Sequence, residues 1–102
     1  MTDKIVVMTA CGSEDEAARI ASVLVEKKLA ACVNILPGVT SVYRWKGGVE
    51  KEPEVLLLIK TRRGLMGEVR REIEVHHSYE LPEAIALSVV DGSEPYLLWF
   101  QE

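Results

Sequence analysis

The sequence has few of the residues on which several classes of protein depend. Its 102 residues include two cysteines, two histidines and one phenylalanine, and 12 basic residues stand against 16 acidic ones. Two cysteines are too few for a disulfide scaffold, so we expect a protein of a reducing compartment. A chain with a net charge of −4 lacks the positive surface that neutralises phosphates, which argues against a nucleic-acid partner.

Long apolar runs and familiar catalytic patterns are also absent. The run Val55–Ile59 is far shorter than the roughly 20 apolar residues that a membrane span needs, and the N-terminus shows no signal-peptide pattern. The sequence contains no G-x-S-x-G, H-E-x-x-H, Walker A or Rossmann glycine pattern. We therefore expect a cytoplasmic protein that has no membrane partner and is not an enzyme of these classes.

What is present is the composition of a folded domain. Hydrophobic residues make up 48% of the chain and charged residues 27%, a balance typical of globular proteins. The length is close to the usual domain size of about 100–150 residues, and no repeat, linker or biased segment interrupts it. We expect one domain, residues 1–102.

The first elements are a strand and a helix. Lys4–Thr9 is short and rich in β-branched residues, as in a buried strand. Ser13 precedes Glu16 by three residues, which is the spacing of a capping box at a helix start. Apolar residues then recur at helical spacing to about Lys28, so we expect a helix that ends there.

A long kinked strand and a hairpin follow. Ala31–Leu36 and Val39–Trp45 form one predicted strand with a kink at Pro37-Gly38, because proline cannot donate to a ladder and glycine tolerates a bulge. Lys46–Gly48 predicts the chain reversal. Pro53–Thr61 is the expected return strand. Its apolar centre shows no alternation, as in a strand that is covered on both faces.

The remaining segments complete a known order of elements. We expect a helix over Arg63–Val75, a fourth strand over Ala84–Val90 and a short last helix over Glu94–Phe100. With right-handed crossovers, the order β-α-β-β-α-β gives an α+β ferredoxin-like sandwich, with an extra C-terminal helix. Two helices cover only one face of the four-stranded antiparallel sheet, so the other face needs a partner.

Two features favour a second copy of the chain as that partner. Val33–Trp45 would extend about 43 Å at about 3.3 Å per residue, whereas a domain of this size is roughly 34 Å across. The hairpin should therefore overhang its domain and offer edges that must be covered. The apolar segment Tyr96–Phe100 also exceeds what one rim helix can bury. The alternative is that this segment folds back onto its own sheet.

The two cysteines belong to no C-x-x-C pair. Cys32 lies among apolar residues and is most simply a buried small hydrophobe. Cys11 lies between the end of the first strand and the start of the first helix. There it is either an unreactive loop thiol or a thiol whose pKa is lowered by the helix dipole.

His76 and His77 are the only histidines. Imidazole is a ligand for copper, zinc and nickel. Adjacent residues on a helix point about 100° apart, so the two histidines can bind one ion only if the helix frays there. The alternative is that one histidine caps the helix and the other is exposed.

Four further polar residues stand beside apolar segments where core residues would be expected. They are Tyr43, Lys60, Tyr79 and Glu83. A pair formed by Lys60 and Glu83 at a subunit junction would either bind a small anion or serve as a structural ion pair.

Several linked motifs then resemble one family. They are Leu29–Gly38, Ser41–Trp45, Leu58–Thr61, His76–Tyr79 and Tyr96–Trp99. Their sequence and order resemble the CutA family of divalent-cation tolerance proteins, and the resemblance covers essentially the whole chain. It implies a cytoplasmic homotrimer of ferredoxin-like subunits, assembled like the PII signalling proteins, with a role in tolerance of copper and other divalent metals and no established catalytic reaction.

The resemblance also implies candidate ligands. The family's bacterial copper site is described as a cysteine late in the first strand together with two adjacent histidines after the second helix. His76 and His77 match the histidines, and Met8 stands at the position of the cysteine. A thioether is a soft but neutral ligand for Cu(I). Cys11 is the alternative sulfur ligand.

A second function of a different class stays open. PII-like trimers bind small ligands in the clefts between subunits, where pockets commonly form. In a sensor or scaffold of this kind the cleft would be lined by Tyr43, Lys60, Tyr79 and Glu83.

Overall fold

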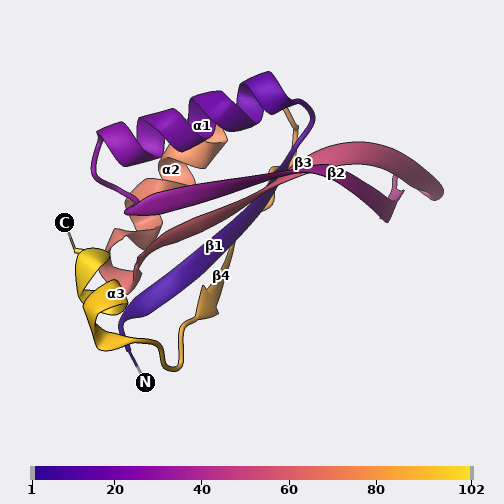
Figure 1. The fold of residues 1–102 in the computed structure, drawn as a ribbon. Coiled ribbons are helices and arrows are strands. Elements are labelled where there is room, and N and C mark those ends of the chain that lie inside the picture. Colours follow the sequence, from indigo (N-terminus) through magenta and orange to yellow (C-terminus); the bar gives the residue numbers. More distant parts are fainter. Residues whose placement is uncertain (1, 102) are drawn as a thin grey trace.

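The computed structural model describes residues 2–101 as a four-stranded antiparallel sheet with two helices on one face (Figure 1). The elements are β1 (Lys4–Cys11), α1 (Glu14–Glu26), β2 (Cys32–Trp45), β3 (Gly48–Arg62), the 3₁₀ turn η1 (Arg63–Leu65), α2 (Met66–His76), β4 (Ile85–Ser88) and α3 (Glu94–Trp99). The strand order is β2-β3-β1-β4. This order confirms the predicted ferredoxin-like α+β fold with its extra C-terminal helix.

The start of α1 follows the predicted capping pattern. The Ser13 hydroxyl accepts a hydrogen bond of 3.1 Å from the Glu16 backbone N–H, and the first turn is acidic, which suits the positive end of the helix dipole. The Glu16 side chain departs from the capping box, because it accepts a bond from the Ser78 backbone instead. The Glu16 side chain therefore ties the first turn of α1 to the segment that follows α2.

The core lies between the sheet and the two long helices. Alternate residues of β1 and β3 point toward α1 and α2, and their side chains interlock with one apolar stripe from each helix. The fully buried members are Val7, Cys11, Ala17, Ile20, Leu24, Leu57, Ile59, Val69 and Ile73. Buried Thr61 is satisfied by donating its hydroxyl to the Leu29 carbonyl at 2.7 Å.

The predicted long strand and its kink are confirmed. The ladder between β2 and β3 shifts register between Leu36 and Val39, where Gly38 has a φ of +80° that favours glycine. Residues 39–54 then pair only within the hairpin, because β1 pairs with β3 no further than Val55. We call residues 39–54 the hairpin arm. It accounts for the elongated shape of the chain, 44 × 25 × 23 Å.

The other strand and helix bounds differ modestly from those predicted. The return strand starts at Gly48 and not at Pro53, because residues 48–52, three of which are charged, complete a ladder with β2. β4 covers only four residues of the expected Ala84–Val90, those that pair with Ile5–Met8 of β1. The expected helix over Arg63–Val75 is divided, since a 3₁₀ turn precedes α2.

The second face of the sheet is not covered by α1 or α2, and among the described residues only the short α3 lies over one end of it (Figure 1). Residues that alternate with the core set point to this face, and they include Met8, Leu58, Ile85 and Leu87. Ile85 and Leu87 are each about half exposed in the single chain, at 52% and 50%. We call this surface the open sheet face.

The C-terminal helix α3 covers only one end of the molecule. Lys60 Nζ donates a 3.0 Å hydrogen bond to the Tyr96 hydroxyl, which ties α3 to β3, and Phe100 is buried. Leu98 and Trp99 remain exposed. The segment therefore folds back in part, as the alternative reading expects, and still leaves apolar surface uncovered.

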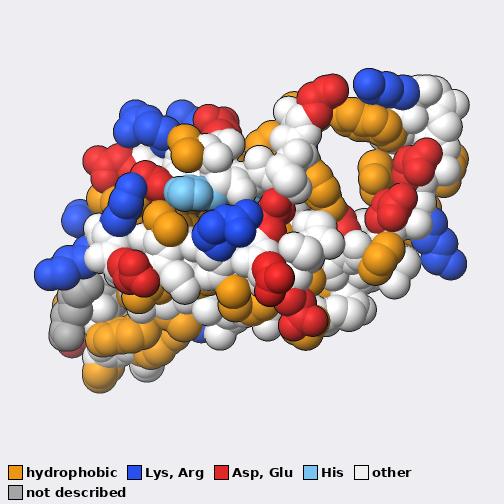
Figure 2. All heavy atoms as spheres, turned by 90° about the horizontal axis from the view of Figure 1, so that it is seen from above, with side chains coloured by type: hydrophobic (Ala, Val, Ile, Leu, Met, Phe, Trp, Pro, Cys, Tyr) orange, Lys and Arg blue, Asp and Glu red, His pale blue; other side chains and the backbone are white. Residues whose placement is uncertain are grey.

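The helical face has the charge pattern of a solvated surface. Figure 2 looks down on this face and shows basic and acidic side chains interspersed over it, with the hairpin arm extending to one side. None of the helices within residues 2–101 is both long and apolar enough to cross a bilayer.

Candidate functional site

His77 turns inward just after α2 ends. It has an extended conformation, with φ −84° and ψ 141°, and its side chain is fully buried at 0% exposure. Its Nε2 lies 2.7 Å from the Ala10 carbonyl oxygen, which can only accept, so Nε2 carries a proton and donates it. Its Nδ1 accepts a bond of 3.2 Å from the Tyr79 backbone N–H. The two bonds together fix a neutral tautomer with the lone pair on Nδ1.

Glu16 faces that lone pair from the first turn of α1. The residue is only 5% exposed. Its Oε1 accepts the 3.0 Å bond from the Ser78 N–H, while its Oε2 lies 3.6 Å from His77 Nδ1. Among the described residues, Oε2 has no hydrogen-bond donor. Two atoms with lone pairs thus face each other in the interior.

Cys11 completes this group as the last residue of β1. It alternates to the helical side of the sheet and is fully buried. Burial raises the pKa of its thiol to about 11, and the nearby Glu16 carboxylate adds to the rise. Cys11 is thus a strand residue and not a loop residue, while its burial and raised pKa agree with the unreactive thiol of the first interpretation. The second interpretation, a pKa lowered by the helix dipole, is wrong.

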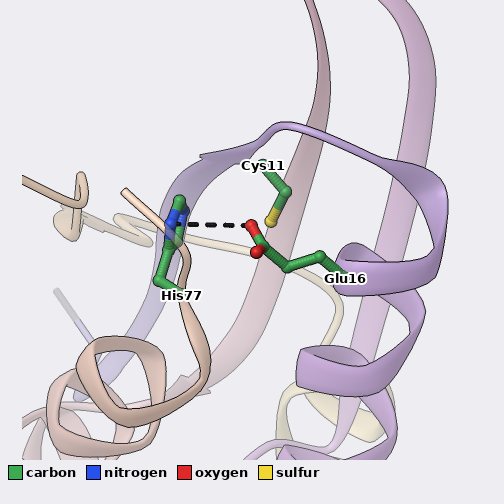
Figure 3. Close-up of side chains that lie close together, drawn as sticks. All are labelled: Cys11, Glu16 and His77. Atoms are coloured by element: carbon green, nitrogen blue, oxygen red, sulfur yellow. Dashed lines mark ion pairs between the residues drawn. The ribbon is translucent and has the colours of Figure 1, made fainter. Parts of the chain in front are cut away.

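The ligand-type atoms of Cys11, Glu16 and His77 lie within 4.8 Å of one another. Figure 3 shows the three side chains pointing toward one another from the end of β1, the start of α1 and the segment after α2. We call this group the buried triad. A thiol, a carboxylate and an imidazole are the ligand types that bind zinc and related divalent metals.

The structure does not bring together the expected metal ligands His76, His77 and Met8. His76 is the last residue of α2, and its Nε2 lies 3.3 Å from Glu72 Oε1, one helical turn back on the surface. Met8 points to the open sheet face, because side chains alternate along β1 and Val7 points to the core. Within one chain, only His77 of the three joins the buried triad.

A cleft of about 510 Å³ lies beside the triad, between the hairpin arm and the segment that precedes β4. It brings together three of the four predicted cleft residues, Tyr43, Tyr79 and Glu83, and adds Glu54. The Tyr79 hydroxyl donates a 2.6 Å bond to Glu54 Oε2. Burial and this carboxylate raise the pKa of Tyr79, and burial together with the Glu54 charge raises the pKa of Glu83.

Lys60 does not reach this cleft. Its ammonium donates to the Tyr96 hydroxyl and lies 5.5 Å from the centre of that ring, and the hydrogen bond raises the pKa of Lys60. The two positions Lys60 and Glu54 on β3 are separated by about 20 Å at about 3.3 Å per residue. No pair of Lys60 with Glu83 occurs within residues 2–101 of one chain, and the expected pair at a subunit junction stays a prediction.

Glu16 and Glu54 are the site residues that the sequence analysis missed. Glu16 carried a signal, because it shares a helical stripe with Ile20 and Leu24, at spacings of four and eight residues, and both of those are buried. An acidic residue on an apolar stripe must find a partner inside the protein. Glu54 had no such signal in the sequence, since it follows Pro53 in a polar stretch.

The chain was compared with known protein families and curated proteins. A family model described as CutA1 divalent ion tolerance protein matches residues 5–102. The divalent-cation tolerance protein CutA of Thermus thermophilus is 44% identical over 97 residues, covering 95% of this chain and 94% of that protein. Protein CutA of Mus musculus is 46% identical over 92 residues, covering 90% of this chain and 52% of that protein. The chain thus spans about half the length of the mouse relative.

Solved structures agree with these matches. CutA from Xylella fastidiosa superposes with a TM-score of 0.94 at 40% identity and covers 97% of this chain and 95% of that chain. CutA from Archaeoglobus fulgidus, described as a periplasmic divalent cation tolerance protein, has a TM-score of 0.92 at 39% identity, covering 95% and 94%. Agreement in sequence and fold over nearly the full length shows that the chain belongs to the CutA1 family of divalent-ion tolerance proteins.

Proposed function

We propose that this protein is a cytoplasmic, non-enzymatic homotrimer that binds divalent cations, copper among them, and so contributes to metal tolerance. One observation carries the metal-binding part of the proposal. The buried imidazole of His77 is held with its lone pair on Nδ1, 3.6 Å from a carboxylate oxygen that has no donor among the described residues. An imidazole binds a metal only through such a lone pair.

Copper is the proposed cation because imidazole nitrogen binds it well and sulfur lies nearby. His77 is the central ligand in this proposal. His76 and Met8 are further ligands only if α2 frays or a neighbouring subunit brings such groups close, because both point away from His77 in one chain.

The trimeric part of the proposal is supported by the surfaces left uncovered in the single chain. The open sheet face exposes Ile85 and Leu87, and α3 exposes Leu98 and Trp99. The hairpin arm has unpaired edges beyond β1. A monomer would leave all three exposed to water, whereas a closed symmetric assembly covers them.

The cytoplasmic location is supported by the two cysteines, both free in the structure. An oxidising compartment favours disulfide formation. The relative from Archaeoglobus fulgidus is described as periplasmic, so fractionation of the native cells is the direct check on this part.

Calorimetric titration with Cu²⁺, on protein whose thiols are reduced beforehand, tests the metal-binding part. Wild type is expected to bind with a defined stoichiometry per chain. His77→Ala should lower the affinity at least about tenfold, which is about 1.4 kcal/mol, while His76→Ala serves as the matched control and retains it. His77→Gln, of similar polarity, guards against loss of fold, and far-ultraviolet circular dichroism checks each variant. Equal copper binding by wild type and by the double variant His76→Ala/His77→Ala would overturn the proposal.

A second candidate function rests on the cleft. Tyr43, Tyr79 and Glu83 line about 510 Å³ of concave surface together with Glu54, and a cleft of this size holds a small molecule. A sensor or scaffold would bind its ligand there and act on a partner protein. If wild type binds no copper, a thermal-shift screen of small molecules, with Tyr43→Ala as the control that loses the hit, tests this alternative.

A further inference from the structure

We infer that Cys11, Glu16 and His77 are the ligands of a buried site for a divalent cation of the zinc and cobalt class. The inference deepens the proposed function, on which it rests for the presence of a cation, by naming a ligand set in which His76 and Met8 take no part.

Among the described residues, no member of the buried triad makes a hydrogen bond to another member. His77 Nδ1 presents a lone pair, Glu16 Oε2 has no donor within residues 2–101, and the two atoms are 3.6 Å apart. Cys11 Sγ belongs to the same group of atoms, all within 4.8 Å of one another. A carboxylate oxygen buried without a donor is costly. A cation between these atoms removes that cost.

The distances between the ligand-type atoms of the triad also fit a metal site. In tetrahedral sites, metal bonds of about 2.0–2.3 Å place ligand atoms about 3.3–3.8 Å apart. The 3.6 Å between His77 Nδ1 and Glu16 Oε2 already has this value. Contracting the longest separation in the triad, which is at most 4.8 Å, needs a movement of about 1 Å, which a small side-chain rotation supplies.

Hydrogen bonds with the backbone hold two of the three proposed ligands in place. Metal-bound histidines almost always donate their second ring N–H to a carbonyl or carboxylate, which orients the ring. Here His77 Nε2 donates to the Ala10 carbonyl at 2.7 Å. The Ser78 N–H holds Glu16 Oε1 at 3.0 Å and leaves Oε2 free. Both ligands are thus oriented by the backbone.

One group competes with the cation for His77. The Tyr79 backbone N–H donates to Nδ1 at 3.2 Å, the longer of the two hydrogen bonds made by this ring. A cation at Nδ1 displaces this bond, which is weaker than a metal–nitrogen bond. Tyr79 also lines the cleft, so filling the site removes one backbone hydrogen bond from a residue of the cleft wall.

Charge selects the class of cation. When a cation binds, the Cys11 thiol loses its proton to solvent and becomes a thiolate ligand, with no change in oxidation state. The thiolate and the Glu16 carboxylate then carry two negative charges, which a divalent cation neutralises. A monovalent Cu(I) would leave one negative charge in the interior, which is unfavourable. Magnesium and calcium prefer oxygen ligands only.

Cobalt(II) is the probe that tests the ligand set. A thiolate bound to Co²⁺ gives a charge-transfer band in the near ultraviolet, and zinc added afterwards should displace it. We expect wild type to develop the band with one Co²⁺ per chain. Cys11→Ser should abolish the band, and Glu16→Gln should weaken cobalt binding at least tenfold.

Matched controls use the other candidate ligands. Cys32→Ser removes the second cysteine of the chain, which is only half-buried, and should keep the band. His76→Ala and Met8→Leu should also keep it. Circular dichroism reports the fold of each variant, and if Cys11→Ser does not fold, Cys11→Ala takes its place. Should neither fold, Glu16→Gln decides the matter.

The outcomes separate this inference from the proposed function. A band that survives Cys11→Ser and disappears in Cys32→Ser overturns the inference, as does cobalt binding that is unchanged by Glu16→Gln. Copper binding that depends on His77, in a protein that shows no thiolate–cobalt band, overturns the inference and leaves the proposed function standing. Wild type that binds neither copper, zinc nor cobalt overturns both.

Discussion

His76 and His77 share a peptide bond but have different surroundings, because α2 ends between them. His76 stays on the helix surface beside Glu72, whereas the extended backbone of His77 directs its ring under the first turn of α1. The chemistry available to each residue therefore depends on one pair of backbone angles. The same end of the helix brings Tyr79 to the cleft, so the buried triad and the cleft are adjacent.

At the residue scale, Glu83→Gln tests the electrostatics of the cleft. Burial and the Glu54 charge raise the pKa of Glu83 above its usual 4.5, so the folded state holds this proton to a higher pH than the unfolded state does. The free energy of unfolding therefore falls as pH rises from about 4.5 through the folded pKa. Glu83→Gln removes this fall and should stabilise the protein at pH 7 by less than about 1 kcal/mol, with no gain below pH 4.

Denaturant unfolding at pH 4 and pH 7 measures the effect at one protein concentration. Glu80→Gln, which changes an exposed carboxylate of the same cleft, is the control and should change neither midpoint. An equal gain from Glu83→Gln at both pH values would contradict the argument.

Part of the site could be predicted from single residues. Cys11 and His77 stood out because sulfur and imidazole are rare in this chain. Their meeting could not be predicted, since it depends on the inward turn of His77. Lys60 does not line the cleft within one chain, and its distance from Glu54 follows from the direction of β3 and not from local sequence.

At the element scale, the turn between β2 and β3 requires a positive φ at both of its central residues. Lys46 and Gly47 both have positive φ, 49° and 84°, as in the type I′ turns that suit two-residue hairpins. The predicted reversal is confirmed, and Gly47 is the residue that allows it at least cost. Lys46 accepts a conformation that is less favourable for a side chain.

Gly47→Ala should therefore destabilise the protein by about 1–2 kcal/mol, the cost of a left-handed conformation for a residue with a Cβ. The loss is steric strain in the backbone, because a Cβ at Gly47 meets no atom within 4 Å. Gly67→Ala is the matched control. It also meets open space, but it lies in the first turn of α2 with no positive φ, so it should be neutral or slightly stabilising. Urea unfolding compares the two, and equal losses would contradict the explanation.

The elements were predictable wherever local signals and tertiary pairing agree. The N-cap of α1, the kink at Pro37-Gly38 and the hairpin turn each have a local cause, and the structure has all three. The first residues of β3 were missed because most of them are charged and become a strand only by pairing with β2. β4 was overestimated because its length is set by the partner residues that β1 provides.

At the scale of the whole molecule, Trp99 tests self-association. Its ring packs with those of Tyr96 and Phe100 and is 38% exposed in the single chain. If the trimer buries it, light scattering should give a mass close to three times 11.4 kDa for wild type. Trp99→Ala should then lower the mass on dilution, since truncating a buried aromatic costs roughly 3–5 kcal/mol.

Val75→Ala is the control for this experiment, because Val75 is an exposed apolar residue on α2, away from the open sheet face. It should leave the mass unchanged. A wild-type mass of 11.4 kDa, or a Trp99→Ala variant with the wild-type mass at every dilution, would contradict the assembly that we propose.

The fold as a whole followed from the sequence because the order of elements and the handedness of crossovers leave few arrangements. The assembly did not follow from the sequence in the same way. It stays a prediction, because the uncovered surface of one chain indicates that something binds there and does not by itself fix how many copies do so.

The hairpin arm has a consequence for the exchange of amide hydrogens. In the single chain, the strand pairing of its residues, 39–54, is only between the two halves of the arm, and an isolated two-stranded ribbon is marginally stable in water. Its amides would then exchange with deuterium through local opening, far faster than those of β1 in the sheet centre. In the trimer that we propose, neighbouring subunits would bind the edges of the arm, and the same amides would exchange only when subunits separate. The amide exchange rate of the arm would thus report how long the proposed assembly stays together.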